Sequence, residues 1–202
     1  MKYLSVDGNC HIFCRSAFYT TLDYLSSKKE LDFTSKFNFL RGEIDSGNWA
    51  LSYLLSMYCF RPKDCIFVVQ PQIILDGQKT SFEALKQISC YMDTIYPLFS
   101  GKRPIKKYIE LGIKNSGLQR DAEEIRELFC IDKERFARPL SAVGNEKYKA
   151  MAAIAYVNKK ELFCFPWMSR ARFMYYHKNL TELLNLLETE NKKMIFPIGI
   201  SE

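Results

Sequence analysis

The fold of this chain is decided by residues 37–55, which read FNFLRGEIDSGNWALSYLL. Residues 37–40 are predicted to form a short apolar strand, and an apolar helix is expected to continue from residue 50 to residue 58. Between them, Gly42 and Gly47 have the spacing of the phosphate loop G-x-x-x-x-G-K-[ST], whose backbone N–H groups cradle phosphate. The stretch therefore predicts either a phosphate loop or a plain strand–turn–helix.

The last two positions of this motif are altered. Asn48 stands where a lysine would neutralise the β- and γ-phosphates, and Trp49 stands where a hydroxyl would hold Mg²⁺. The Trp49 ring is expected either to fill the volume of the metal or to pack into the core beside the sheet. The candidate nucleotide-binding loop comprises Gly42, Glu43, Ile44, Asp45, Ser46, Gly47, Asn48, Trp49 and Ala50.

Length and composition indicate one globular domain or a domain with a small lobe: 202 residues, 48% hydrophobic and 26% charged. With no long apolar run and no signal peptide, the protein is expected to be cytoplasmic. Seven scattered cysteines suit a reducing compartment and buried structural roles. No metal site is expected, and the cluster of Cys10, His11 and Cys14 is too small to predict one. The net charge of +6 does not by itself indicate nucleic-acid binding. Lys147, Lys149, Lys159 and Lys160 are therefore assigned to a solvated face.

The order of apolar stretches along the chain predicts an α/β fold with a mostly parallel sheet. Residues 1–36 are expected to form an antiparallel β lobe that opens with a strand pair, 3–6 with 12–13. Residues 37–92 and 146–202 are expected to form the α/β core, with strands at 65–69, 73–75, 88–92, 162–165 and 194–196. Residues 93–145 are expected to be a helical insert in which Asp121 and Glu124 form a capping box, and Ser81 is expected to cap a short helix in the core.

This order resembles the nucleotide-binding domain of ABC transporters and related ABC ATPases, which are P-loop NTPases. After the loop at Gly42 and Gly47, residues 138–141 resemble the approach to the LSGGQ signature, and residues 150–155 resemble the helix behind it. Residues 162–169 occupy the place of Walker B. The resemblance spans about residues 37–169, and its specificity comes from order and spacing because no single motif is intact. It implies signature-like residues at Leu140, Ser141, Ala142, Val143 and Gly144.

The resemblance also implies that the residues of the hydrolytic site are lost. Phe165 replaces the Walker B aspartate and Pro166 replaces the catalytic glutamate, while Asp93 or Thr94 takes the place of the Q-loop glutamine. The D-loop lacks its aspartate, and the switch histidine falls near Gly199. These losses converge on the γ-phosphate and its Mg²⁺, whose charge must be cancelled during phosphoryl transfer. No catalytic residue is therefore assigned; Mg²⁺ is not expected to bind, and ATP binding stays open.

Three functions remain as alternatives. The first is a hydrolysis-deficient ABC-type domain that acts as a binding or regulatory partner, in a homodimer or a heterodimer with another ABC-type subunit, with a membrane permease as a further partner. The second is a divergent ATPase, although Glu43 and Asp45 would repel phosphate. The third is a role without nucleotide, the pocket being empty or holding another ligand. His177 is expected to serve packing or the surface. A partner surface on the helical insert is assigned to Tyr96, Pro97, Phe99, Lys102 and Arg103.

Overall fold

A four-stranded parallel sheet lies at the centre of the computed structural model, which describes residues 4–7, 11–16, 19–25, 30–33, 35–43, 48–61, 65–69, 71–99 and 101–200. Its order is β5 (Phe37–Arg41), β11 (Lys193–Ile198), β10 (Leu162–Cys164) and β9 (Ser89–Tyr91). All neighbouring pairs are parallel. The apolar runs in β10 and β11 suit strands that are covered on both faces. The predicted α/β fold with a mostly parallel sheet is confirmed.

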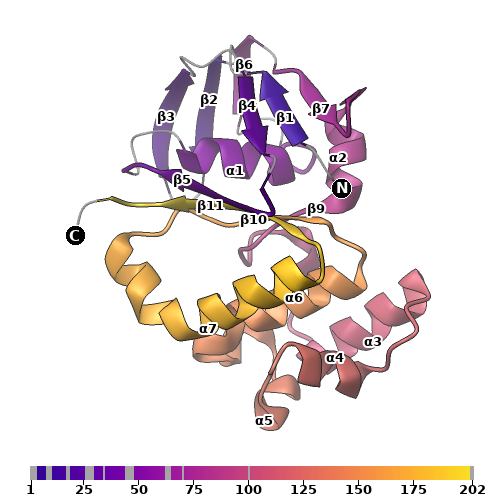
Figure 1. The fold of residues 1–202 in the computed structure, drawn as a ribbon. Coiled ribbons are helices and arrows are strands. Elements are labelled where there is room, and N and C mark those ends of the chain that lie inside the picture. Colours follow the sequence, from indigo (N-terminus) through magenta and orange to yellow (C-terminus); the bar gives the residue numbers. More distant parts are fainter. Residues whose placement is uncertain are drawn as a thin grey trace.

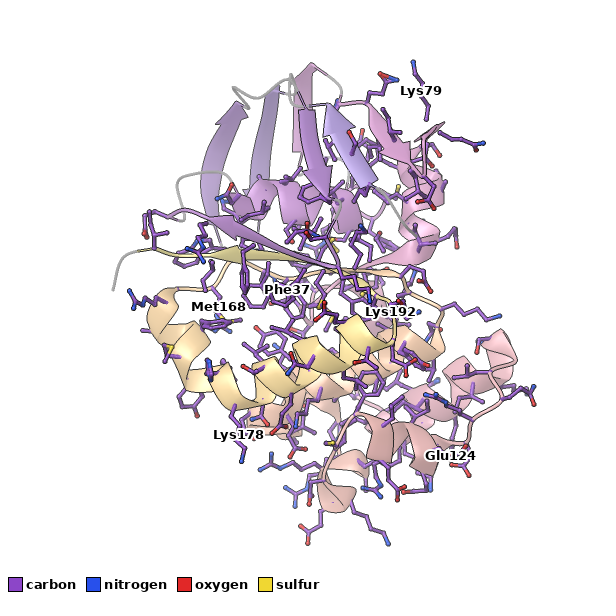
Figure 2. All side chains as sticks on the ribbon, in the orientation of Figure 1. Phe37, Lys79, Glu124, Met168, Lys178 and Lys192 are labelled. Carbon is purple, nitrogen blue, oxygen red and sulfur yellow. The ribbon has the colours of Figure 1, made fainter. Side chains whose placement is uncertain are left out.

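Helices cover both faces of this sheet (Figure 1). On one face lies α1 (Asn48–Met57), in which every residue after the first is buried. A helix that is apolar all round must be enclosed, and α1 lies between the parallel sheet and the antiparallel strands. On the other face lie α6 (Lys147–Val157) and α7 (Arg170–Thr189). In Figure 2, Lys178 on α7 points away from the sheet, as a solvated lysine should.

Antiparallel strands form the lobe above α1. One sheet has the order β4 (Glu30–Phe33), β1 (Leu4–Asp7), β7 (Ile73–Leu75) and β8 (Gln78–Thr80). The other has the order β3 (Tyr19–Leu25), β2 (His11–Ser16) and β6 (Cys65–Val69). Asp76 and Gly77, which form the tight turn between β7 and β8, both have positive φ, of 50° and 82°.

The predicted pairing of the first two strands is wrong. Both strands exist, but both edges of β1 are taken by β4 and β7, and both edges of β2 are taken by β3 and β6. The strands at 65–80 thus complete the antiparallel lobe and take no place in the parallel sheet. Lys193 at the start of β11 links the two parts, because its ammonium group donates to the carbonyl of Phe33 at 2.6 Å.

Short helices follow the lobe and build the insert. The first, α2 (Phe82–Ile88), begins at Ser81, whose hydroxyl accepts from the N–H of Ala84. The insert contains a 3₁₀ turn at Pro97–Phe99, then α3 (Ile105–Ser116), α4 (Ala122–Leu128) and α5 (Lys133–Phe136). The capping box of Asp121 and Glu124 at the start of α4 is present. Both predicted caps are therefore confirmed.

Several expectations about the surface are wrong. Tyr96 and Phe99, assigned to a partner surface, are each only 2% exposed, whereas Pro97, Lys102 and Arg103 are exposed. Lys149, assigned to a solvated face, is buried, and its ammonium group forms an ion pair with Glu182 at 2.5 Å. Not all cysteines are buried, because Cys130 is exposed. Among the described helices, none is long and apolar enough to cross a membrane.

Candidate functional site

The candidate site lies where the four parallel strands end. In open α/β sheets, ligands bind outside the carboxyl ends of the strands. Here these ends bring together Gly42 after β5, Gly199 after β11, Phe165 after β10 and Asp93 after β9. The helix α1 begins on one side of this edge and α7 on the other. Segments that are far apart in sequence therefore meet at one place.

Gly42, the first glycine of the candidate loop, is held at two points. Its N–H donates to the carbonyl of Ile198 at 3.0 Å, which extends the pairing of β5 with β11. Its carbonyl accepts from the indole N–H of Trp167 at 3.0 Å. The carboxylate of Glu43 accepts from the N–H of Ile200 at 3.0 Å, so this acidic side chain is turned toward the end of β11. Residues 44–47, Ile44, Asp45, Ser46 and Gly47, lie outside the described part of the chain.

Asn48, Trp49 and Ala50 form the first turn of α1. Asn48 is partly exposed, whereas Trp49 and Ala50 are fully buried. The Trp49 ring meets Tyr53 edge to face with ring centroids 6.2 Å apart, and Tyr53 meets Tyr91 of β9 in the same way at 5.4 Å. An aromatic row thus runs from the start of α1 to the end of β9. Position 49 presents an apolar ring to this row.

The segment after β10, which the ABC resemblance assigns to Walker B, belongs to the core. Alternate residues of a strand point to opposite faces, and Cys164 lies toward α1, where its thiol contacts the Ser56 hydroxyl. The Phe165 side chain lies toward the other face, stacked on Phe196 at 4.7 Å and near Tyr148 of α6 at 5.9 Å. The backbone carbonyl of Phe165 accepts from the Ser52 hydroxyl of α1 at 2.5 Å. Pro166, which follows, is buried.

The signature-like residues lie on the helical side of the molecule. Leu140, Ser141 and Ala142 form a 3₁₀ turn that packs against α6, and Val143 links it to a second turn that begins at Gly144. Leu140 and Val143 are buried, whereas Ser141, Ala142 and Gly144 are exposed. Gly144 has a positive φ of 57°, a conformation that glycine adopts without strain. The turn therefore offers an exposed hydroxyl and small residues at the surface.

A cavity of about 440 Å³ opens beside the ends of β9 and β10. Its walls include Asp93 and Thr94 after β9, Pro166 after β10, Lys147 at the start of α6 and Arg172 in the first turn of α7. The Asp93 carboxylate accepts from the Thr94 hydroxyl at 3.2 Å and from the N–H of Ile95 at 3.3 Å. Two cations thus face a cavity at the carboxyl edge, where an anion would be favoured.

Sequence reasoning missed these two cations as site residues. Lys147 was assigned to a solvated face, and Arg172 was given no role. The available signal was their position, since each lies in the first turn of a helix, α6 after the insert and α7 after β10. His177 lies elsewhere: it is exposed on α7 and meets Phe173 edge to face at 5.8 Å. It lines neither this cavity nor the groove beside β5 described below.

The buried thiols of the sheet are poor candidates for chemistry. Burial raises the pKa of the Cys164 thiol to about 12, although the hydrogen bond with Ser56 opposes this. Burial also raises the pKa of the Cys90 thiol well above its ordinary value. Both groups stay protonated at neutral pH, and only a thiolate is a good nucleophile or metal ligand. Among the described residues, no three His, Cys, Asp or Glu side chains gather as they would around a metal ion.

Solved structures with the same architecture identify the fold. CbiO1 from Clostridium perfringens, described as part of the ABC transporter complex cbiONQ, superposes with a TM-score of 0.64 at 12% identity, covering 99% of this chain and 80% of that one. The chain has the ABC ATPase fold. The ATP-binding cassette MJ0796, solved as a dimer in a post-hydrolysis state with ADP and Pi, gives a TM-score of 0.62 at 13% identity, covering 98% and 88%.

A third ABC structure has the same fold. A Pyrococcus furiosus protein assigned as an ABC transporter ATP-binding protein gives a TM-score of 0.60 at 14% identity, with 96% of this chain and 90% of that one covered. No protein-family model and no curated protein matches the sequence. The resemblance inferred from the order of the motifs is therefore confirmed at the level of the fold.

Proposed function

We propose that this ABC-fold domain does not hydrolyse ATP and acts as a binding or regulatory partner of another protein. The observation that carries the proposal is the placement of Phe165. In the register of the ABC resemblance this residue replaces the Walker B aspartate, and its ring is fully buried against Phe196 on the face of the sheet opposite α1. A core position of this kind cannot hold a metal at the end of β10. Pro166, in place of the catalytic glutamate, has no group that accepts a proton.

The other altered positions support the same proposal. Phosphoryl transfer depends on positioning and on cancelling the charge of the phosphates with lysine and metal. Asn48 brings an amide in place of an ammonium group, and Trp49 brings a buried ring in place of a hydroxyl. A Mg·triphosphate beside these groups would lose water without gaining equivalent ligands, which is costly. ATP without Mg²⁺ is a weaker but possible ligand of the loop backbone.

The proposed partners follow from the relatives in structure. MJ0796 was solved as a dimer and cbiO1 is part of a transporter complex. We infer for this chain a homodimer or a heterodimer with another ABC-type subunit, and contact with a membrane permease at the cytoplasmic side. The exposed turn with Ser141, Ala142 and Gly144 supports this proposal, because a hydroxyl and small residues at the surface suit a contact with a second subunit.

Nucleotide binding and hydrolysis by the purified protein test the proposal. ATP is titrated by calorimetry with and without Mg²⁺, and phosphate release is followed under the same conditions. We expect no hydrolysis above the buffer rate, and any ATP binding should be unchanged by Mg²⁺. Asn48→Ala is the site variant, and Lys79→Ala on the exposed β8 is the matched control for a contaminating ATPase.

The contrary outcome is specific. Mg²⁺-dependent phosphate release that is lost in Asn48→Ala and kept in Lys79→Ala would show a divergent ATPase, and the proposal would be wrong. Light scattering of the protein alone and with candidate ABC subunits tests the partner role separately. If the protein stays monomeric and binds none of these subunits, the proposed partner role is wrong, whereas the proposed loss of hydrolysis is unaffected.

A further inference from the structure

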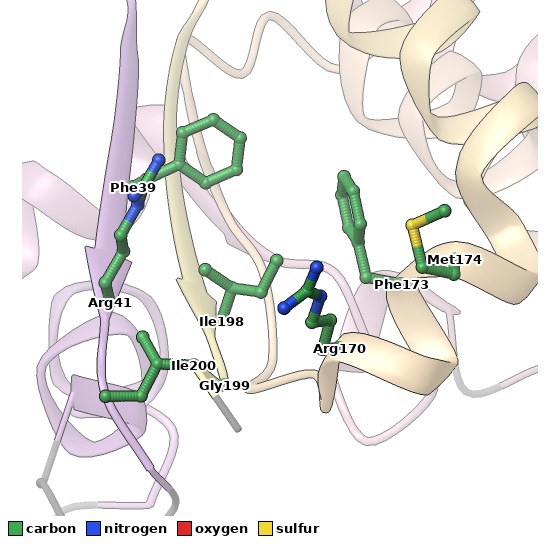
Figure 3. Close-up of a pocket in the computed structure, with 8 residues that line it drawn as sticks. All are labelled: Phe39, Arg41, Arg170, Phe173, Met174, Ile198, Gly199 and Ile200. Carbon is green, nitrogen blue, oxygen red and sulfur yellow. The ribbon is translucent and has the colours of Figure 1, made fainter. Parts of the chain in front are cut away.

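A second hollow lies on the far side of the first turn of α7, in a place that the nucleotide motifs do not use. It is a groove of about 390 Å³ between the edge strand β5, the end of β11 and the start of α7. Figure 3 shows Phe39 on one wall and Phe173 on the other, with Ile198 between them. Pockets for small organic molecules have volumes of this order and mostly apolar walls. The groove therefore has the size and lining of a ligand site.

The apolar walls are unusually exposed to solvent. Phe39 is 42% exposed, Met174 59% and Ile200 60%, and these are three of the five large hydrophobic side chains that are exposed in the described chain. All three line the groove. The reason lies in the sheet: α7 covers β11, where Phe173 meets Phe196 at 5.7 Å, while β5 extends beyond this cover. Apolar surface gathered in one concave place indicates binding.

Two arginines complete the lining. Arg41 lies at the end of β5, and Arg170 is the first residue of α7, with its guanidinium between Ile198 and Phe173 in Figure 3. Neither guanidinium forms an ion pair or a hydrogen bond with the residues that the structure describes. A guanidinium binds carboxylate through two parallel hydrogen bonds, and these bonds are stronger beside apolar surface that excludes water.

We propose that this groove binds a small organic acid: a carboxylate attached to an apolar chain or ring. The apolar part would lie between Phe39, Phe173 and Met174, and the carboxylate would meet Arg170, with Arg41 as the second cation. A concave groove fits a single small molecule better than a flat membrane surface. A second copy of this chain brings its own net charge of +6 and is a poorer match for two arginines.

The groove also adjoins the candidate nucleotide loop. Gly199 and Ile200 line the groove, and the N–H of Ile200 donates to the Glu43 carboxylate at 3.0 Å. A Cβ added to Gly199 would lie 3.1 Å from the Trp167 ring, and Trp167 in turn donates to Gly42. An acid in the groove would therefore bind next to two contacts at the start of the loop. These are the hydrogen bond from Ile200 to Glu43 and the hydrogen bond from Trp167 to Gly42. The acid is placed to influence the loop as well as to occupy the groove.

Decanoate is the first probe and decanol its neutral analogue, both titrated as monomers into the full-length protein by calorimetry. We expect saturable 1:1 binding of decanoate and at least tenfold weaker binding of decanol, since a hydrogen bond to a charged group contributes about 1.5–3 kcal/mol. Arg170→Gln should weaken decanoate at least tenfold and leave decanol unchanged, whereas Phe39→Ser should weaken both. The matched control is Lys178→Gln, an exposed cation of the same helix that points away from the sheet (Figure 2).

Four results would overturn the proposal. The first is that decanoate at millimolar concentration shows no saturable binding and leaves the melting temperature of the protein unchanged. The second is equal affinity for decanoate and decanol, and the third is an equal loss in Arg170→Gln and Lys178→Gln. The fourth is another occupant: binding to anionic vesicles but not to monomeric decanoate, or a dimer that Phe39→Ser dissociates. None of these results depends on ATP, so the function proposed above is tested separately.

Discussion

Replacing Phe165 by aspartate places a carboxylate where the ABC resemblance implies the Walker B aspartate, and it should destabilise the protein severely. The ring is fully buried between Phe196 and Tyr148, and its backbone carbonyl already accepts from Ser52. The introduced carboxylate would therefore enter an apolar layer between the sheet and the helices α6 and α7. It would not face the start of α1, where a metal and phosphates would lie.

The expected magnitude has two parts. Removing a buried phenylalanine ring costs about 3–5 kcal/mol, because packing is lost and a cavity remains. If the carboxyl stays neutral up to pH 7, its pKa is at least about 3 units above the unfolded value of about 3.9, which costs a further ~4 kcal/mol at about 1.36 kcal/mol per unit. The sum of about 7–9 kcal/mol is comparable with the whole stability of a domain, about 5–15 kcal/mol.

The second part, the cost of burying the carboxyl group, increases as the pH rises. Burial raises the folded-state pKa of a carboxyl group, so the folded variant binds the proton that the unfolded chain releases. Below pH 4 both states are protonated and the penalty vanishes. Between pH 4 and pH 7 the variant should lose about 1.4 kcal/mol per pH unit relative to Phe165→Asn, the uncharged variant of similar shape.

Urea unfolding of both variants at pH 4 and pH 7, followed by circular dichroism, measures this difference. If the aspartate variant is unfolded at pH 7 without urea, its refolding on acidification gives the same information, and Phe165→Leu checks that the site tolerates an apolar side chain. Equal stability of the Asp and Asn variants at pH 7 would refute the placement of Phe165. Mg²⁺-dependent stabilisation of the Asp variant would refute it as well.

Two further predictions concern neighbouring groups. Trp167→Phe keeps most of the ring but removes the hydrogen bond to the Gly42 carbonyl, so the free energy of unfolding should fall by about 1 kcal/mol, measured by urea unfolding. Cys164, with a folded-state pKa of about 12, stabilises the protein below pH 9, and this contribution is lost as the pH rises from 9 toward 12. Cys164→Ala should therefore lose less stability than the wild type between pH 9 and pH 11 in thermal unfolding scans, and an identical pH dependence would contradict the assigned burial.

Local signals in the sequence were sufficient for most elements. The cap at Ser81 and the capping box of Asp121 and Glu124 depend on residues three positions apart, and both are formed. The turn at Asp76 and Gly77 needs positive φ at two adjacent residues, which this pair supplies. The parallel strands were found because their apolar runs are continuous. Each of these features is encoded within a few residues of where it appears.

Long-range choices could not be found in this way. β1 and β2 are adjacent in the chain but belong to different sheets, and the partners of β1 come from residues 30–33 and 73–75. Lys149 looks like a surface lysine in sequence, yet it is buried because Glu182, 33 residues later on α7, meets its ammonium group. Such placements depend on which surfaces meet, and this is set by the packing of the whole chain.

The candidate site shows the same division. Asn48, Trp49 and Phe165 were chosen from order and spacing, and their assignment as altered motif positions stays a prediction; the structure shows that Trp49 and Phe165 are fully buried. The hollows beside the first turn of α7 were not found, since each lining comes from three stretches of chain that are far apart in sequence. Arg170 and Arg172 are two residues apart, yet one lines the groove and the other the cavity. A run of basic residues carries no signal of that separation.

The segment 165–172 is the structural link between the two hollows and the candidate loop. Trp167 holds the Gly42 carbonyl, Ser169 caps α7 by accepting from the N–H of Arg172, and Arg170 extends into the groove. A ligand alters a distant site only if it binds two arrangements of the protein with different affinity. An acid bound at Arg170 meets this condition if the first turn of α7 shifts, because the same turn carries Arg172 into the cavity. If the proposed loss of hydrolysis holds, the domain would then still respond to a ligand, bound at the first turn of α7.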